Sequence, residues 1–118
     1  MRALQTFSNL YLYQGVVDFR KSISGLATLV EQQLSLSPFA EALFIFVSRD
    51  RKKVKLLYWD KSGFALWYKV LEEERFMLPR KRSENSLILS AKELELLLEG
   101  CDIFKIKPHK TLQYNRIS

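Results

Sequence analysis

The sequence of 118 residues predicts an α+β fold, in which a small, mostly antiparallel sheet packs with one long N-terminal helix and one short C-terminal helix. Two observations lead to this expectation. In the middle of the chain, apolar and aromatic runs alternate with short polar breaks, as in strands joined by tight turns. On either side of this region, apolar residues recur every three or four positions, which is the period of an amphipathic helix.

The N-terminal segment predicts a short strand followed by the long helix. NLYLYQG alternates leucine with tyrosine and ends at Gly15, which is typical of a strand that enters a turn. Between Phe19 and Leu34 apolar residues line one helix face, and Asp18 stands where an aspartate can cap a helix. Pro38 disfavours helical backbone in the residue before it, so the helix is expected to end near SLSPF.

The central segment predicts an antiparallel meander. ALFIFV is apolar throughout, as expected for a strand that is buried on both faces. SRDRKK is a polar break of turn length, and VKLLYWD is joined to FALWYKVL by DKSG, which has aspartate and glycine at turn positions. We therefore expect VKLLYWD and FALWYKVL to form a β-hairpin whose aromatic side chains are divided between its two faces.

The clearest local signal lies in LSAKELELLLEG, which predicts the short helix. Ser90 and Glu93 have the spacing of a capping box, and Gly100 suits the position after the last helical turn. No linker divides the chain, so residues 1–104 are expected to form a single α+β domain. Residues 105–118 are basic and lack periodicity, and we expect a flexible tail there.

Composition favours a cytoplasmic protein without a catalytic centre. No stretch approaches the roughly 20 apolar residues of a membrane span, and the N-terminus does not resemble a signal peptide. Cys101 is the single cysteine, and His109 is the single histidine. One chain therefore offers no internal disulfide and no Ser-His, Cys-His or two-histidine metal arrangement. Because a glycine-rich phosphate loop is also absent, we expect no enzyme activity, no metal and no cofactor.

Basic clusters are the remaining functional signal, since 19 Lys and Arg against 13 Asp and Glu give a net charge of +6. Phosphate binding requires only several cations on one face, and its affinity falls steeply with salt. The candidate nucleic-acid-binding residues are Arg20, Lys21, Arg49, Arg51, Lys52, Lys53, Lys55, Arg80, Lys81 and Arg82. The alternative for the predicted turn at 49–53 is a solvated loop that contacts no phosphate.

Arg20 and Lys21 require a separate explanation, because the helix dipole disfavours cations in the first turn of the predicted helix. Two interpretations remain open. Together with the unpaired N–H groups of the helix start, the two cations could form an anion site. Alternatively, they could form salt bridges with the acidic run Glu72–Glu74.

Aromatic residues of the predicted hairpin provide a second candidate surface. The hairpin carries Tyr58, Trp59, Phe64, Trp67 and Tyr68. Such residues can stack on single-stranded bases, but strand alternation buries about half of them whatever the function. An exposed member is more simply explained as a protein contact, and Trp59 and Trp67 are the candidate partner-binding residues.

Several short motifs follow one another in a fixed order between residues 10 and 104. They are Asp18 to Lys21, Leu43 to Phe46, Lys55 to Asp60, Gly63-Phe64, Leu66 to Lys69, Leu71-Glu72, Arg75-Phe76 up to Pro79, and Leu97 to Gly100. In this order and spacing the chain resembles the TnpB-type accessory proteins of the insertion-sequence 66 group of bacterial transposons. It departs from the family at Ser22, where a glycine is common, and at Tyr58, where a tryptophan is common.

The resemblance implies a small protein that is encoded beside a larger transposase and is needed for efficient transposition. It supplies no catalytic residues, because the strand-transfer carboxylates of such elements belong to the larger protein. We therefore expect a non-catalytic, bacterial, cytoplasmic protein that binds DNA phosphates, the transposase of the same element, or both. The alternative is a module that binds the transposase without touching DNA.

Overall fold

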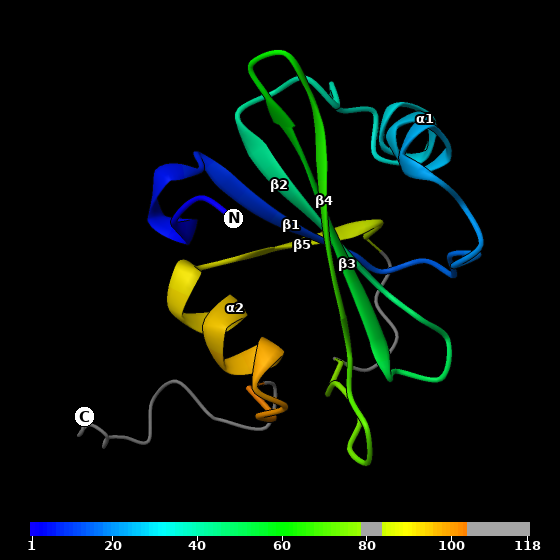
Figure 1. The fold of residues 1–118 in the computed structure, drawn as a ribbon, viewed down its shortest axis with the longest axis vertical. Coiled ribbons are helices and arrows are strands. Elements are labelled where there is room, and N and C mark those ends of the chain that lie inside the picture. The colour runs from blue at the N-terminus through cyan, green and yellow to red at the C-terminus, as the bar shows by residue number, and fades with distance from the viewer. Residues whose placement is uncertain (79–83, 104–118) are drawn as a thin grey trace.

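The computed structural model describes residues 1–78 and 84–103, which form a five-stranded sheet with one α-helix on each face (Figure 1). The strand order is β4-β3-β2-β1-β5. The elements are the 3-10 helix η1 (Leu4–Thr6), β1 (Asn9–Tyr13), α1 (Ile23–Gln33), β2 (Ala42–Val47), β3 (Lys53–Asp60), β4 (Gly63–Val70), β5 (Ser86–Leu89) and α2 (Ala91–Leu98).

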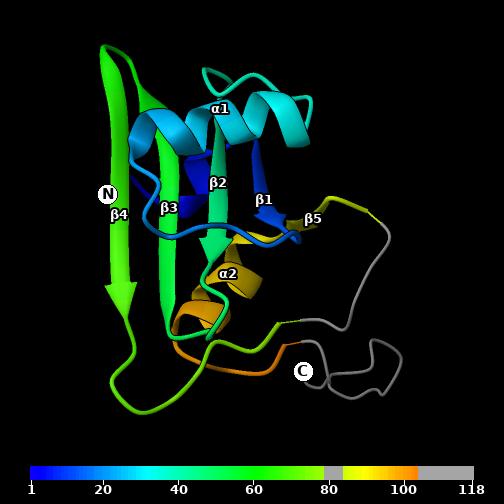
Figure 2. The same cartoon turned by 90° about the vertical axis from the view of Figure 1, so that its right-hand side faces the viewer.

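The α+β class is confirmed, but the sheet is mixed. β2, β3 and β4 form the expected antiparallel meander, whereas β1 runs parallel to β2, with Leu10 opposite Leu43. Parallel neighbours need a crossover connection, and α1 supplies it (Figure 2). The sequence did not reveal β5, which pairs antiparallel with β1 at the far edge. Its four residues are too few to give a periodic signal.

The N-terminal helix is not long, because α1 has only 11 residues. Asp18 does not cap it and instead closes a turn ahead of the helix. The Arg20 N–H donates to the Asp18 carboxylate (2.9 Å), and the Lys21 N–H donates to the Asp18 carbonyl (3.0 Å). Aspartate favours such turns by accepting from the backbone two residues on. The N-cap of α1 is Ser22, whose side chain makes no capping hydrogen bond.

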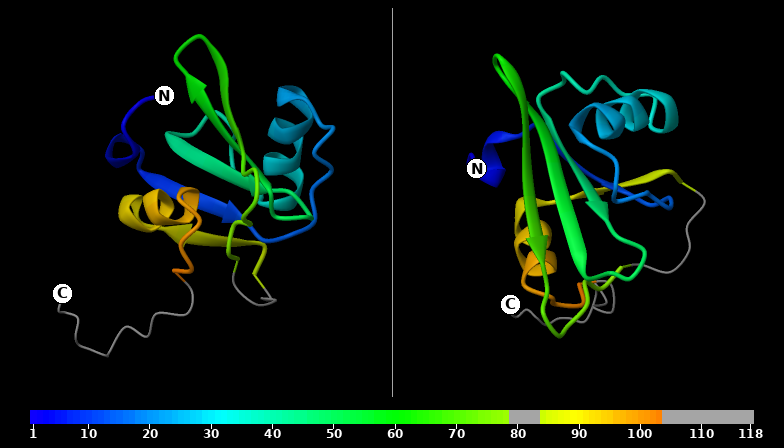
Figure 3. Two further views of the ribbon diagram at one scale, coloured as in Figure 1. Left: turned by 60° about the horizontal axis from the view of Figure 1, so that its bottom comes forward. Right: turned by 45° about the vertical axis from the view of Figure 1, so that its right-hand side comes forward.

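β2 is the centre of the structure, since all six of its residues are buried. Alternate residues of this strand enter two separate cores. On the α1 face, Phe44 and Phe46 pack with Leu26 and Val30 of the helix. The core of the α2 face includes Leu10, Leu12, Leu43, Ile45, Leu56, Phe76, Leu94 and Leu97. The two views of Figure 3 show the strands between these helices, which explains why ALFIFV has no polar position.

α2 is held at both ends by side chains, and its predicted capping box is confirmed. The Glu93 N–H donates to the Ser90 hydroxyl (3.1 Å), and the Ser90 N–H donates to the Glu93 carboxylate (2.8 Å). At the other end the Lys69 ammonium of β4 donates to the Leu98 carbonyl (2.9 Å). A cation is favourable at this negative end of the helix dipole. Gly100 then adopts a left-handed φ of 89°, which suits a glycine after a helix.

Replacing Ser90 with alanine is expected to lower the free energy of unfolding by about 1 kcal/mol, because the Glu93 N–H loses its acceptor. Ser62→Ala in the exposed β3–β4 turn is the control and should change the value by less than about 0.5 kcal/mol. Urea unfolding followed by tryptophan fluorescence measures both variants. Equal stabilities of the two variants would contradict a stabilising role of the capping box.

Candidate nucleic-acid interface

The β2–β3 turn, residues 48–53, carries the main cluster of unpaired cations and is called the basic turn below. Arg49 and Arg51 are exposed, whereas Lys52 and Lys53 are partly buried. Within residues 1–78 and 84–103, none of these four side chains forms a salt bridge. Four unpaired cations on one short turn can meet a phosphate without first breaking an internal bond.

Ser48 and Asp50 fix the backbone of the basic turn. The buried Ser48 hydroxyl donates to the Asp50 carboxylate (2.6 Å) and accepts from the Lys53 N–H (3.0 Å). The same carboxylate accepts from the Lys52 N–H (3.1 Å). The Ser48 hydroxyl and the Lys52 N–H together hold the pKa of Asp50 below its usual value. Asp50 therefore orders the turn, while the neighbouring cations remain at the surface.

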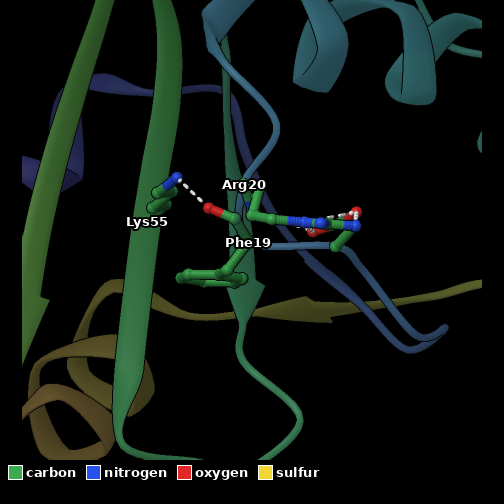
Figure 4. A network of polar contacts seen from close by, with 4 residues as sticks. Phe19, Arg20 and Lys55 are labelled. Carbon is green, nitrogen blue, oxygen red and sulfur yellow. Dashed lines mark hydrogen bonds and ion pairs between the residues drawn. The ribbon is translucent and has the colours of Figure 1, made fainter.

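Lys55 is engaged elsewhere. Its ammonium donates to the Phe19 carbonyl (2.8 Å) and the Lys21 carbonyl (3.3 Å), and Figure 4 shows the first of these bonds. It also lies 4.9 Å from the centre of the Phe19 ring and 5.5 Å from that of Tyr68. Carbonyl oxygens and aromatic faces both attract a cation. Lys55 thus attaches the loop before α1 to the sheet, and a phosphate would have to compete with these contacts.

Arg20 and Lys21 precede α1, so the expectation that they occupy its first turn is wrong. Arg20 forms its salt bridge with Asp18 (Nη2–Oδ2, 2.8 Å), and its Nε donates to the same carboxylate. The salt bridges with Glu72–Glu74, one of the two interpretations left open by the sequence, are not present among the described residues. Lys21 is exposed and, within that same part of the chain, has no salt bridge.

Hydrogen bonds from Arg20 hold the pKa of the Asp18 carboxyl far below its ordinary value. The carboxyl therefore binds its proton more readily in the unfolded chain than in the folded one. The contribution of this pair to stability is present above the ordinary pKa of aspartate, about 3.9. It is lost as the pH falls from there through the lower pKa of the folded state.

A groove of about 440 Å³ connects the basic turn with the loop before α1. It is lined by Val16, Val17, Asp18, Phe19, Ser48, Arg49, Asp50 and Lys53. The fold thus brings together two segments that are far apart in the sequence. The lining of the groove carries two carboxylates, of Asp18 and Asp50, and two cations, of Arg49 and Lys53, so these charges offset one another and the groove itself does not favour an anion.

Glu72–Glu74 lie close to the basic turn, a proximity that the sequence did not reveal. The Leu71 N–H donates to the Lys52 carbonyl (2.7 Å), and the Phe76 N–H donates to the Arg51 carbonyl (2.6 Å). The exposed acidic residues occupy the short loop between these two bonds. Their carboxylates partly offset the charge of the turn, so its net charge is lower than the sequence of residues 49–53 alone indicates.

The two tryptophans lie on opposite faces of the β3–β4 hairpin. Trp67 is partly buried against the α2-face core. Trp59 packs edge-on against Phe64 (5.0 Å between ring centres) and against Phe39 (4.9 Å), which is 56% exposed. We call Phe39, Trp59 and Phe64 the aromatic tip. Nothing in the sequence signals Phe39 as a surface residue, because it lies in a loop outside any periodic segment.

The remaining candidates from the sequence lie outside the described residues or stand alone. Arg80, Lys81 and Arg82, together with the tail 105–118 and its His109, lie outside the described residues. Cys101 is exposed and forms no disulfide. Residues 1–78 and 84–103 contain no cluster of His, Cys, Asp and Glu that could hold a metal ion. In that same part of the chain, no helix has the length and hydrophobicity needed to cross a membrane.

Comparison with known proteins assigns the family. The family model described as IS66 Orf2-like protein matches residues 8–108. The chain belongs to this family. It is 34% identical over 91 residues to the uncharacterized protein y4jC of Sinorhizobium fredii, covering 77% of each chain. It is 30% identical over 93 residues to y4hO of the same organism, covering 79% of this chain and 80% of that one. No solved structure matches the chain.

Family membership confirms the resemblance inferred from the order of motifs and points to an accessory role in transposition. Two of those motifs now have a structural explanation. In the segment from Asp18 to Lys21, the aspartate closes the turn and the carbonyls of Phe19 and Lys21 receive the Lys55 ammonium. These two motifs therefore belong to one contact between the loop before α1 and the sheet.

Lys55→Met is expected to lower the free energy of unfolding by about 1–3 kcal/mol, because it leaves two backbone carbonyls without their donor. Lys53→Met, on the same face of β3 and without such contacts, is the matched control and should change stability by less than about 0.5 kcal/mol. Thermal unfolding followed by circular dichroism measures both variants. A loss in Lys53→Met as large as that in Lys55→Met would contradict the anchoring role.

Proposed function

We propose that this IS66 Orf2-like protein is a non-catalytic accessory factor of transposition that binds the phosphate backbone of DNA through its basic turn. The observation that supports the proposal most directly is the set of unpaired cations on an ordered turn. It comprises Arg49, Arg51, Lys52 and Lys53. Lys21 is unpaired on the neighbouring loop and extends this set.

The order of the basic turn matters for affinity. Hydrogen bonds to Ser48 and Asp50 already fix its backbone, so binding does not have to order the main chain as well. Arginine can also bind a phosphate through two parallel N–H groups. Such contacts orient a protein on DNA without reading the base sequence. The proposed activity is therefore backbone binding with little sequence preference.

Neutralising Arg49, Arg51 and Lys52 together with glutamine is expected to weaken binding to duplex DNA and to flatten its salt dependence. Each lost phosphate contact lowers the slope of log K against log salt by about 0.9, so three losses lower it by about 2.7. Fluorescence anisotropy of a labelled duplex over a series of salt concentrations measures the slope.

Lys92→Gln on α2 provides the control, because this lysine is exposed and lies outside the basic turn. This control should leave the slope unchanged, because it removes no phosphate contact, and it should retain more affinity than the triple variant. Failure of the wild-type protein to bind DNA at low salt would refute the proposal.

A second candidate function is docking to the transposase of the same element through the aromatic tip. The exposed Phe39 beside Trp59 supports it, because aromatic residues in contact with solvent are enriched at protein interfaces. In this reading the cations do not contact DNA. The surface lies at the opposite end of β3 from the basic turn, so the two functions can be separated by mutation.

Phe39→Ser is expected to reduce co-purification with the transposase after nuclease treatment, since it removes the most exposed ring of the aromatic tip. Ile88→Ser, an apolar residue of β5 that is 61% exposed, is the matched control and should retain the complex. Loss of the complex on nuclease treatment alone would instead favour an association through DNA.

A further inference from the structure

β4 forms one edge of the sheet, and its outer side is uncovered. It is the first strand in the sheet order, and Figure 2 shows it at the outer end of the sheet. Among the residues that the structure describes, no strand pairs with that side. No residue of β4 is buried, and Tyr68 and Val70 are 51% and 45% exposed.

The backbone of β4 has unused hydrogen-bonding groups along this edge. A two-residue loop joins Asp60 to Gly63. In such a hairpin, the backbone N–H and C=O groups of the two residues that close the loop bond to each other. Odd-numbered residues of β4 therefore bond to β3, as the Leu71 N–H does to the Lys52 carbonyl. The N–H and C=O groups of the even-numbered residues face outward. They belong to Phe64, Leu66, Tyr68 and Val70.

The usual protections of an edge strand are missing from β4. Natural edge strands are short, bulged, or carry proline or charged side chains that prevent pairing with another strand. β4 has eight residues, contains no proline and pairs with β3 without a skipped residue. Its single charged side chain, Lys69, is turned onto the last carbonyl of α2. β5, the opposite edge, is only four residues long.

We propose that β4 pairs with β4 of a second copy of this chain, in an antiparallel arrangement that joins the two sheets into one. A two-fold axis normal to the sheet makes the α1 face of one copy continue into the α1 face of the other. Side chains of a strand alternate between its faces, so a residue of one copy can pair only with a residue whose number differs from its own by an even number. A register centred on Trp67 sets Phe64 against Val70 of the second copy and Leu66 against Tyr68. All four lie on the α1 face, so the exposed apolar side chains of the edge cover one another.

Charge favours the same antiparallel arrangement. It brings the hairpin turn of one copy, which carries Lys61, beside the end of β4 in the other copy, where the acidic loop Glu72–Glu74 follows the strand. Within the described residues neither Lys61 nor Glu72–Glu74 has a salt-bridge partner. Lys69 opposes Ala65, so no like charges meet. A register centred on Leu66 would instead extend Val70 past Gly63, the first residue of the other β4, and leave Val70 without an apolar partner.

The oligomeric state of the full chain tests the proposal. Sedimentation equilibrium should detect a species of twice the chain mass of 13.9 kDa. Val70→Lys places a charge against Phe64 of the second copy and should raise the dissociation constant about ten-fold or more. Ile88→Lys adds the same charge to β5, the opposite edge of the sheet, at an isoleucine that is 61% exposed, and it should leave the constant unchanged. Circular dichroism confirms that both variants are folded.

A charge exchange tests the antiparallel arrangement independently of the edge itself. Glu73→Lys should weaken the dimer several-fold at low salt, and adding Lys61→Glu should restore the dissociation constant to within about two-fold. A monomer at every accessible concentration would overturn the proposal. So would dissociation by Ile88→Lys on β5 but not by Val70→Lys, because it would assign the interface to the other edge. The measurement contains no DNA, so its outcome is independent of the basic turn.

Discussion

The structure depends on the burial of β2 on both faces. A strand with six apolar residues must be covered twice, and this requirement determines where both helices lie. α1 covers one face as part of the crossover that makes β1 parallel to β2, and α2 covers the other. The β3–β4 hairpin extends the sheet on one side of this double core. β4, at the outer edge of this extension, receives less cover than β3, and none of its residues is buried.

The sequence correctly predicted most of those features of the fold that depend on contacts between neighbouring residues. The capping box of α2, the hairpin turn and the fully apolar strand each involve neighbouring residues, and each was predictable from the sequence. One error was local: Asp18 has the sequence position of a helix cap, yet its carboxylate accepts from Arg20, two residues on, in a turn ahead of the helix. The other errors arose where contacts between remote residues decide the structure. The parallel pairing of β1, the strand β5 and the proximity of Glu72–Glu74 to the basic turn depend on partners that are remote in sequence.

The same distinction applies to the cations, which the sequence presented as one cluster. Lys55 lies on β3 near the loop before α1, and its ammonium binds carbonyls and aromatic faces there. Lys69 serves the end of α2 in the same way. Arg49, Arg51 and Lys52 have no such partner in the described part of the chain. Charge patterning alone cannot distinguish a structural lysine from one that is available to a ligand, because the difference lies in which backbone carbonyl is within reach.

The basic turn and the β4 edge are connected through the acidic loop between β4 and Phe76. In one copy, the basic turn with this loop has five cations against four carboxylates, counting Arg75, so its net charge is only +1. Pairing of two β4 strands would place the Lys61 turn of the second copy beside this acidic loop and leave the basic turn less compensated. Lys53 opposes Val70, so the two turns would lie about six residues apart along the strands, roughly 20 Å. When two phosphate-binding turns are linked in one rigid sheet, binding of the first raises the effective concentration of the second at the DNA. The dimer would therefore bind DNA more tightly than a single turn of low net charge.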